Sequence, residues 1–215
     1  MWVPDAATDL WALRDHVASY LAEDDALLAA RAAAARAGCV PVEPDAGAAL
    51  RFLAATIGAR AVVEVGTGTG VSGLWLLHGM AVDGVLTSID VDPEHQRVAR
   101  GGFTEAGYGP SRFRLINGMG LEVLPRLTDA GYDLVFVDAG AADHARYLDE
   151  AVRLLRPGGI VVLAGVLTAN VLDPEADDTV TLAQREVSHQ VRQDERLVPV
   201  LLPLGDGLLA ALKRG

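Results

Sequence analysis

The chain has 215 residues, of which 51% are apolar and 22% charged, and its formal net charge is -11 at pH 7. This length and apolar fraction are typical of one globular domain with a sizeable core, and they exclude a disordered tail. The negative charge repels phosphate backbones and anionic lipid surfaces, so we expect neither nucleic acid nor a membrane as partner.

Other features of the sequence favour a cytoplasmic protein. Asp5 and Asp9 stand where a signal peptide would have basic residues, and no run approaches the roughly 18 consecutive apolar residues of a membrane span. Cys39 is the only cysteine, so no internal disulfide can form. We expect it to be a small, buried apolar side chain.

The chain begins with helical sequence. Residues 5–37 are rich in Ala, Leu and Arg and contain no Pro or Gly, which predicts a helix with a break near the acidic residues 23–25. Gly38 ends this helix, residues 39–44 form an extended linker, and residues 45–57 are predicted to be helical again.

A regular alternation of strands and helices follows. Strands are predicted at residues 61–65, 85–90, 113–116, 134–138 and 160–163, and helices between them at 71–80, 93–106, 121–130 and 144–155. Alternation at this spacing requires right-handed crossovers and produces a parallel, doubly wound sheet. Continuous apolar runs suit strands that are buried on both faces.

The last part of the chain is predicted to close the sheet. A helix at residues 179–193 precedes two apolar runs, 197–202 and 208–212, which a Gly-Asp-Gly turn separates. The runs predict an antiparallel hairpin, although the second by itself also suits a helix. We therefore predict a single α/β domain with a mostly parallel, seven-stranded, Rossmann-like sheet. Residues 1–41 are its helical extension and linker, and residues 42–215 its core.

A glycine-rich turn, Glu-Val-Gly-Thr-Gly-Thr-Gly at residues 64–70, follows the first predicted strand. Glycines allow a sharp turn and the close approach of a ligand, so this strand, turn and helix indicate a nucleotide-binding site. Gly66-x-Gly68-x-Gly70 fits the methyltransferase pattern, whereas Gly68-x-Gly70-x-x-Gly73 fits the dinucleotide fingerprint. The strand ends directly before Gly66, which favours S-adenosylmethionine as cofactor and makes a nicotinamide-dependent oxidoreductase the weaker alternative.

The second predicted strand ends on acidic residues. An acidic side chain at this tip accepts hydrogen bonds from the ribose hydroxyls of either cofactor class. Asp92 precedes Pro93, a residue suited to the first helical position, so Asp92 is predicted to cap the next helix. Asp90 is then predicted to bind the ribose.

In its strand, glycine turn and acidic strand tip, the chain resembles class I S-adenosylmethionine-dependent methyltransferases. More closely, it resembles the small O-methyltransferases of the catechol and caffeoyl-coenzyme A type. The matching stretches are residues 62–72, 88–95, 132–138, 154–159 and 204–209.

The resemblance implies a set of cofactor contacts. Glu64, Gly66 and Ser72 would hold the methionine end, Asp90 the ribose, and residues 118–120 the adenine. Asp138 would lie beside the amino group and the sulfonium. The full set is Val42, Glu64, Gly66, Thr67, Gly68, Ser72, Asp90, Val91, Gly118, Met119, Gly120 and Asp138.

The sequence departs from this family at the metal and the base. The family holds a divalent ion with an Asp after the fourth strand and an Asp-Asn pair after the fifth. Asp138 matches the first ligand, but Ala164 and Gly165 replace the pair and offer no side-chain oxygen. Ala141 replaces the family's lysine base, and Lys213 is the only lysine in the chain. We therefore predict that the protein acts without the metal or binds it with strongly reduced affinity.

His144 stands where the family has a tyrosine. It is a candidate base, because an unperturbed pKa of about 6.5 suits proton transfer; the alternative is an exposed histidine in the first turn of a helix. A metal site rebuilt from Asp138, Asp143 and His144 is a further alternative, disfavoured because Asp143 is expected to cap that helix. The remaining histidines, expected to be surface or core residues, are His16, His78, His95 and His189.

The sequence thus predicts an S-adenosylmethionine-dependent methyltransferase that acts on an oxygen of a small molecule, with Asp138 and His144 as candidate catalytic residues. The resemblance implies a homodimer. Alignment of the acceptor with the methyl group alone can lower the barrier by ~7–11 kcal/mol, so transfer does not require the metal. The alternative is a non-catalytic S-adenosylmethionine-binding module, since the metal pair and the lysine are lost together.

Overall fold

The computed structural model describes residues 10–215, which begin with three helices: α1 (Leu10–Ser19), α2 (Asp25–Ala37) and α3 (Pro44–Thr56). The predicted break between the first two is present, because the Asp24 carboxylate caps α2 by accepting a hydrogen bond from the Leu27 N–H. Gly38 ends α2 in the left-handed conformation, as predicted. The part of the first predicted helix before residue 10 lies outside the described residues.

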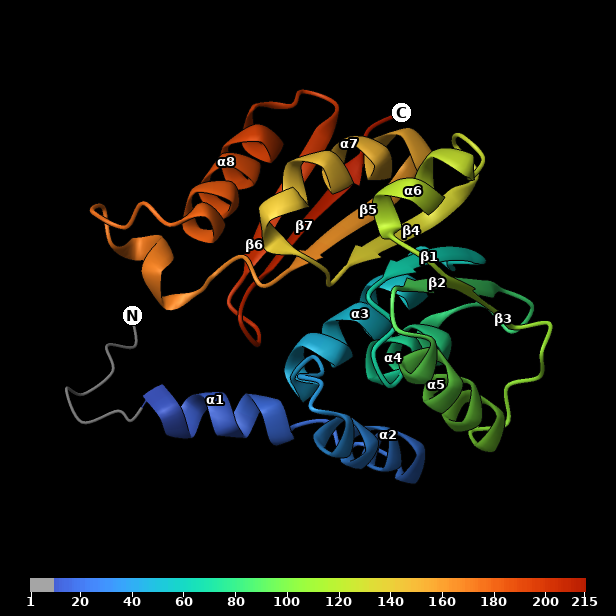
Figure 1. Cartoon of the computed structure of the whole chain (residues 1–215). Helices are drawn as coiled ribbons and strands as arrows, with labels where there is room; N and C mark the ends of the chain where they lie inside the picture. Colours follow the sequence, from blue (N-terminus) through green and yellow to red (C-terminus); the bar gives the residue numbers. More distant parts are fainter. Residues whose placement is uncertain (1–9) are drawn as a thin grey trace.

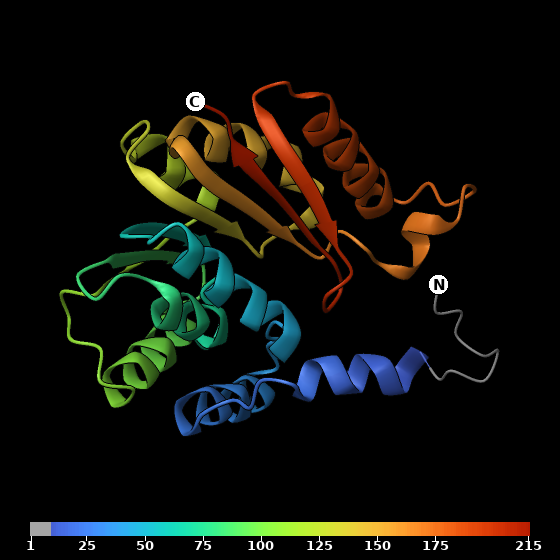
Figure 2. The ribbon, with the colours of Figure 1, turned by 180° about the vertical axis from the view of Figure 1, so that it is seen from behind.

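The strands form one twisted sheet (Figures 1 and 2). They are β1 (Ala61–Val65), β2 (Val85–Asp90), β3 (Phe113–Asn117), β4 (Tyr132–Val137), β5 (Leu155–Ala164), β6 (Leu197–Leu202) and β7 (Leu208–Lys213). Their order is β3-β2-β1-β4-β5-β7-β6, with β7 antiparallel to both of its neighbours. The predicted doubly wound, seven-stranded sheet and its closing hairpin are therefore confirmed.

Helices cover both faces of the sheet (Figure 1). On one face α2 and α3 pack with α4 (Val71–Gly79) and α5 (Pro93–Glu105), around the fully buried Trp75 and Phe103. On the other face lie α6 (Gly120–Val123), α7 (His144–Leu154) and α8 (Thr179–Gln193), over a second apolar cluster. Short 3-10 turns occupy Leu124–Arg126, Ala141–Asp143 and Ala169–Leu172. Burial on both faces explains the continuous apolar strands.

Two elements differ from the predictions. The helix predicted at residues 121–130 is only the short α6 and a 3-10 turn, because Pro125 lacks an N–H and Leu127 is extended. Strand β5 begins at Leu155, earlier than predicted, because Leu155 pairs with Tyr132 across an irregular register. Neither difference moves the carboxyl ends of the parallel strands.

Two further points concern the chain as a whole. The predicted boundary after residue 41 falls in the linker between α2 and α3. The N-terminal helices nevertheless pack on the rest of the domain: α1 contacts α3, and α2 contacts α4 and α5. Between residues 10 and 215, no helix combines the length and apolar character that crossing a bilayer requires.

Candidate functional site

A cleft of about 290 Å³ lies at the carboxyl ends of β1, β2 and β4. Open α/β sheets bind their ligands at this edge. The structure brings together ten of the predicted cofactor contacts in its wall: Val42, Gly66, Thr67, Gly68, Ser72, Asp90, Val91, Gly118, Gly120 and Asp138. The other two, Glu64 and Met119, do not line it.

Gly66 begins the turn in a position that only glycine can occupy. Its φ is 99°, and a Cβ added there would lie 2.2 Å from the carbonyl oxygen of Asp138. The backbone of Asp138 in turn donates its N–H to the carbonyl oxygen of Val65 at 2.8 Å. The turn after β1 and the end of β4 are therefore in direct backbone contact, which places Asp138 beside the glycine turn.

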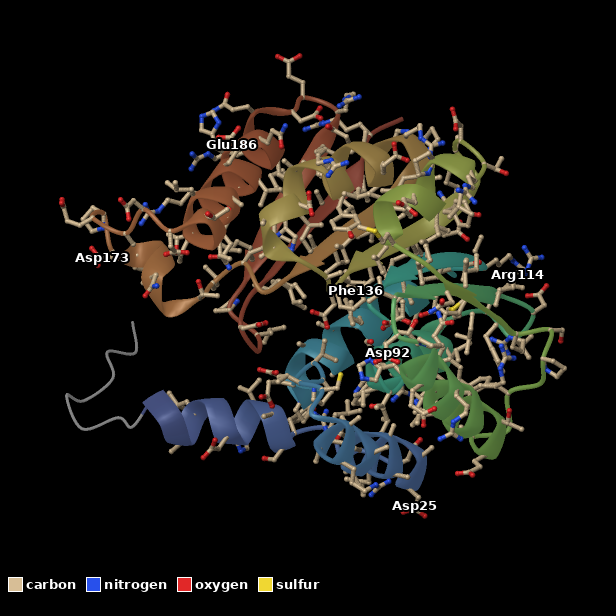
Figure 3. The ribbon with its side chains drawn as sticks, viewed as in Figure 1. Asp25, Asp92, Arg114, Phe136, Asp173 and Glu186 are labelled. Atoms are coloured by element: carbon tan, nitrogen blue, oxygen red, sulfur yellow. The ribbon has the colours of Figure 1, made fainter. Side chains whose placement is uncertain are left out.

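Asp90 is held at the tip of β2 by two backbone groups. Its Oδ2 accepts the N–H of Gly68 at 2.8 Å, and its Oδ1 accepts the N–H of Asp92 at 2.8 Å. Asp92 caps α5 by accepting the N–H of Glu94 at 2.8 Å, as predicted, and Figure 3 shows it at the start of that helix. The carboxylate of Asp90 is thus fixed in the cleft wall with lone pairs left for a ligand.

Glu64 lies beneath the turn. It is 0% exposed and accepts hydrogen bonds from the Oγ of Ser72 at 2.6 Å and the Oγ of Ser88 at 2.5 Å. Ser88 Oγ also lies 2.6 Å from Thr67 Oγ1. Burial raises the pKa of Glu64 to about 7, against the opposing effect of the two serine hydrogen bonds. Glu64 therefore orients Ser72 and Thr67, which line the cleft. Met119 is 58% exposed and does not line the cleft.

Several residues of the cleft were missed by the sequence reasoning. Cys39, expected to be buried, is only half-buried and forms part of the wall, with its Sγ 3.0 Å from where a Cβ on Gly68 would stand. His95, expected to have no role, also lines the cleft, with Nδ1 4.0 Å from Oδ1 of Asp90. The only feature of the sequence that could have indicated a role for His95 in the cleft was its position in the first turn of the helix that follows Asp90. No local pattern marked Cys39.

Two further cavities adjoin the cleft. One, of about 480 Å³, is lined by the linker residues 40–43, by Leu167 and Thr168, and by Gly205 and Asp206; it is called the acceptor pocket below. The other, of about 240 Å³, lies between His144, Gln184 and Asp206. Asp138 lines the cleft and both cavities.

The carboxyl group of Asp138 binds a proton more tightly than an ordinary aspartate does. Solvent reaches it from the cavities, yet the surrounding protein displaces much of its hydration shell, which raises its pKa to about 6. The negative charge of Asp206 is the second cause of this rise. Asp138 is therefore a carboxyl group that changes charge close to neutral pH.

His144 is 1% exposed, so the alternative of an exposed histidine is wrong. The first turn of α7 is covered by α8, a contact between distant parts of the sequence. Within residues 10–215, Nδ1 of His144 has no hydrogen-bond partner. Burial lowers the pKa of His144, and the charge of Asp206 opposes this effect. The imidazole is therefore neutral at pH 7.

The residues present do not fit the metal that the resemblance implies. Ala164 ends β5 and Gly165 follows it, and neither carries an oxygen ligand. Asp143 binds Arg146 at 2.9 Å and makes no capping bond, contrary to expectation. No group of three His, Cys, Asp or Glu among the described residues is placed to hold a metal ion, so the alternative site around Asp143 is not assembled. Lys213 donates to the carbonyl oxygens of Val152 and Leu155, at the opposite end of the sheet.

The parallel sheet, the glycine turn and the acidic strand tip define an α/β protein with a site for a nucleoside cofactor. A sequence model of the family described as "O-methyltransferase" matches residues 18–214, so the chain belongs to the O-methyltransferase family. This family excludes the nicotinamide-dependent alternative.

The chain is similar to relatives of known sequence and structure. A protein of Mycolicibacterium vanbaalenii, named for the O-methyltransferase family, is 55% identical over 203 residues, or 94% of this chain and 90% of the relative. A crystal structure of a Corynebacterium glutamicum protein has a TM-score of 0.90 at 36% identity, covering 95% of this chain and 97% of that one. The O-methyltransferase TomG of Streptomyces achromogenes, solved with S-adenosylmethionine, has a TM-score of 0.85 at 29% identity, covering 95% and 96%.

Proposed function

We propose that this S-adenosylmethionine-dependent O-methyltransferase methylates a hydroxyl of a small molecule without a divalent metal, and that Asp138 accepts the hydroxyl proton. The observation that carries the proposal is the position of Asp138, which lines both the cofactor cleft and the acceptor pocket. A reacting hydroxyl must lie where these two cavities meet.

The cleft residues suit the cofactor. S-adenosylmethionine supplies an electrophilic methyl group when it is bound. Asp90, fixed by the N–H groups of Gly68 and Asp92, is placed to accept the ribose hydroxyls. Gly66 and Gly68 have positive φ and leave the turn open to a ligand on its cleft side. Val42 and Ser72 line the wall, in keeping with contacts to the methionine part.

We assign the base to Asp138 in preference to His144. A base must come within hydrogen-bond reach of the proton that it takes. The carboxylate of Asp138 is accessible from the acceptor pocket, whereas the imidazole of His144 is buried. With a pKa of about 6, Asp138 is ionised at neutral pH and a better proton acceptor than an ordinary aspartate.

Transfer of a labelled methyl group to a panel of phenols tests the proposal. We expect transfer to be unaffected by EDTA, and Asp138→Asn to lower kcat by about 100-fold or more. His144→Gln is the comparison variant and is expected to retain more activity. Loss of activity in EDTA with recovery in Mg²⁺ would show that a metal is needed. Full activity of Asp138→Asn would remove the base assignment. Cofactor binding without transfer to any phenol or to cell extract would instead support the non-catalytic module.

We also propose a homodimer. The edge strand β6 exposes the apolar side chains of Val198, Val200 and Leu201, and an exposed apolar edge favours pairing with another chain. Sedimentation velocity of the protein and of Val200→Lys tests this, because a charge on the edge should shift a dimer towards monomer. The cytoplasmic location rests on the sequence alone, and cell fractionation tests it.

A further inference from the structure

We propose that the acceptor of this enzyme carries a positive charge, and that Glu43 and Asp206 recognise it. The inference rests on the proposed function, because it concerns the acceptor pocket of that reaction. The class of molecule that it names is a small phenol or alcohol that bears an ammonium or guanidinium group.

The wall of the acceptor pocket contains three carboxylates and no basic side chain. Glu43, Asp138 and Asp206 supply the acids, and the other lining residues are apolar or neutral. Elsewhere in the chain carboxylates are commonly paired with arginine, as Glu23 is with Arg31. Among the described residues, the carboxylates of Glu43 and Asp206 take part in no hydrogen bond or ion pair. The pocket therefore offers two acidic groups without a cation.

Both carboxylates are carried by well-defined backbone. Glu43 occupies the N-cap position of α3 without making a capping hydrogen bond, so its carboxylate is not used by the helix. Asp206 lies between Gly205 and Gly207, which both have positive φ, in the turn that joins β6 and β7. Strand, turn and helix thus fix the backbone positions from which the two acids reach the pocket.

The turn and α3 are far apart in the sequence but adjacent in space. The N–H of Gly205 donates to Oδ2 of Asp45 at 3.3 Å, and a Cβ added to Gly205 would lie 3.5 Å from Cβ of Glu43. Figures 1 and 2 show the β6–β7 turn beside the start of α3. The two acids therefore act on the same cavity from two elements.

The spacing of the acids suits an organic cation better than a metal ion. In the described part of the chain no three acidic or histidine side chains are close enough to share one ion. The cavity, at about 480 Å³, is instead in the size range of small-molecule sites. Val40, Pro41 and Leu167 supply an apolar wall for the body of the ligand.

The positive charge of the cofactor would be neutralised by Asp138 and not by Glu43 or Asp206. Asp138 lines the cofactor cleft, where its charge would act on the positive sulfonium of S-adenosylmethionine. Glu43 and Asp206 line the acceptor pocket and not the cleft. Their charge therefore acts on the acceptor, attracting a cationic group and repelling a carboxylate.

Three matched dihydroxyphenyl compounds test the inference: one with an ethylammonium side chain, one with a neutral ethyl group and one with a propionate. Their binding to the protein loaded with S-adenosylhomocysteine is measured by calorimetry, beside labelled-methyl transfer. We expect the ammonium compound to bind about fivefold more tightly than the neutral one, since partly exposed ion pairs contribute modestly, and the propionate to bind more weakly. This preference should shrink in high salt, a readout that needs no variant.

Glu43→Gln and Asp206→Asn should each reduce the ratio between the affinities of the ammonium compound and the neutral compound. Glu186→Gln is the matched control, because it removes the same charge from an exposed position on α8 (Figure 3) and should preserve the preference. Circular dichroism verifies that the variants fold.

The outcomes separate the inference from the proposed function. Equal affinities for the three compounds, or tighter binding of the propionate, overturn the inference even if all three are methylated. Tighter binding of the ammonium compound without any transfer supports the inference and counts against the proposed function. Binding of Mg²⁺ alone that Asp206→Asn abolishes would overturn the inference, because the acids would then serve a metal.

Discussion

Glu64 makes the stability of this protein depend on pH. Its pKa is raised by burial from 4.5 to about 7. Between these pH values the folded protein keeps a proton that the unfolded chain has released. The free energy of unfolding therefore falls as the pH rises from 4.5 to about 7, and Glu64 contributes no further change above that. At about 1.4 kcal/mol per pKa unit, the loss amounts to ~3 kcal/mol.

Glu64→Gln removes this titration and keeps the shape of the side chain. The amide oxygen can accept the hydroxyl of Ser72, and the amide nitrogen can donate to Ser88, whose own proton then turns to Thr67. We expect the variant to be more stable than the parent at pH 8 by ~1–3 kcal/mol, because it removes a buried charge. The gain is less than the full ~3 kcal/mol because two charge-assisted hydrogen bonds are exchanged for weaker neutral ones. At pH 5 the advantage should vanish.

Urea denaturation at pH 5, 6, 7 and 8 measures the effect as the difference between parent and variant. Taking the difference cancels the other titrating groups, including Asp138, whose pKa is also raised. Glu186→Gln, on the exposed face of α8, is the control and should leave the pH profile unchanged. A difference that is constant from pH 5 to 8 would refute the reasoning.

Four other predictions concern the turn, the cleft and the core. Gly66→Ala should cost at least ~3 kcal/mol in urea denaturation, because its Cβ would meet the Asp138 backbone at 2.2 Å; Gly101→Ala, where a Cβ meets nothing within 4 Å, should be neutral or stabilising. Asp90→Asn should weaken S-adenosylmethionine binding in calorimetry by about tenfold or more, through lost charged hydrogen bonds; unchanged affinity would contradict the ribose assignment. Phe103→Ala should cost ~3–5 kcal/mol of stability, because the ring is fully buried, and a loss below ~1 kcal/mol would count against its place in the core. The rate of methyl transfer should rise with pH through about 6, where Asp138 ionises, and a flat profile from pH 5 to 8 would argue against it as base.

The sequence by itself determined the features that depend on neighbouring residues. The glycine turn after β1 was predicted in register, because Gly66, Gly68 and Gly70 adopt conformations that few other residues tolerate. The cap at Asp92 and the bounds of α8 were also predicted correctly, because helix caps and helical periodicity depend on residues that are close in the sequence. The doubly wound topology followed from the alternation of strands and helices.

Only the tertiary structure decided which side chains share a cavity. His144 is buried because α8, from a later part of the chain, covers it, and Glu64 faces Ser72 and Ser88 beneath the turn rather than the cleft. Asp206 reaches the acceptor pocket opposite Glu43 only because the β6–β7 turn packs on α3. Such contacts join residues far apart in the sequence, and local propensities carry no information about them, because they arise from how whole elements pack.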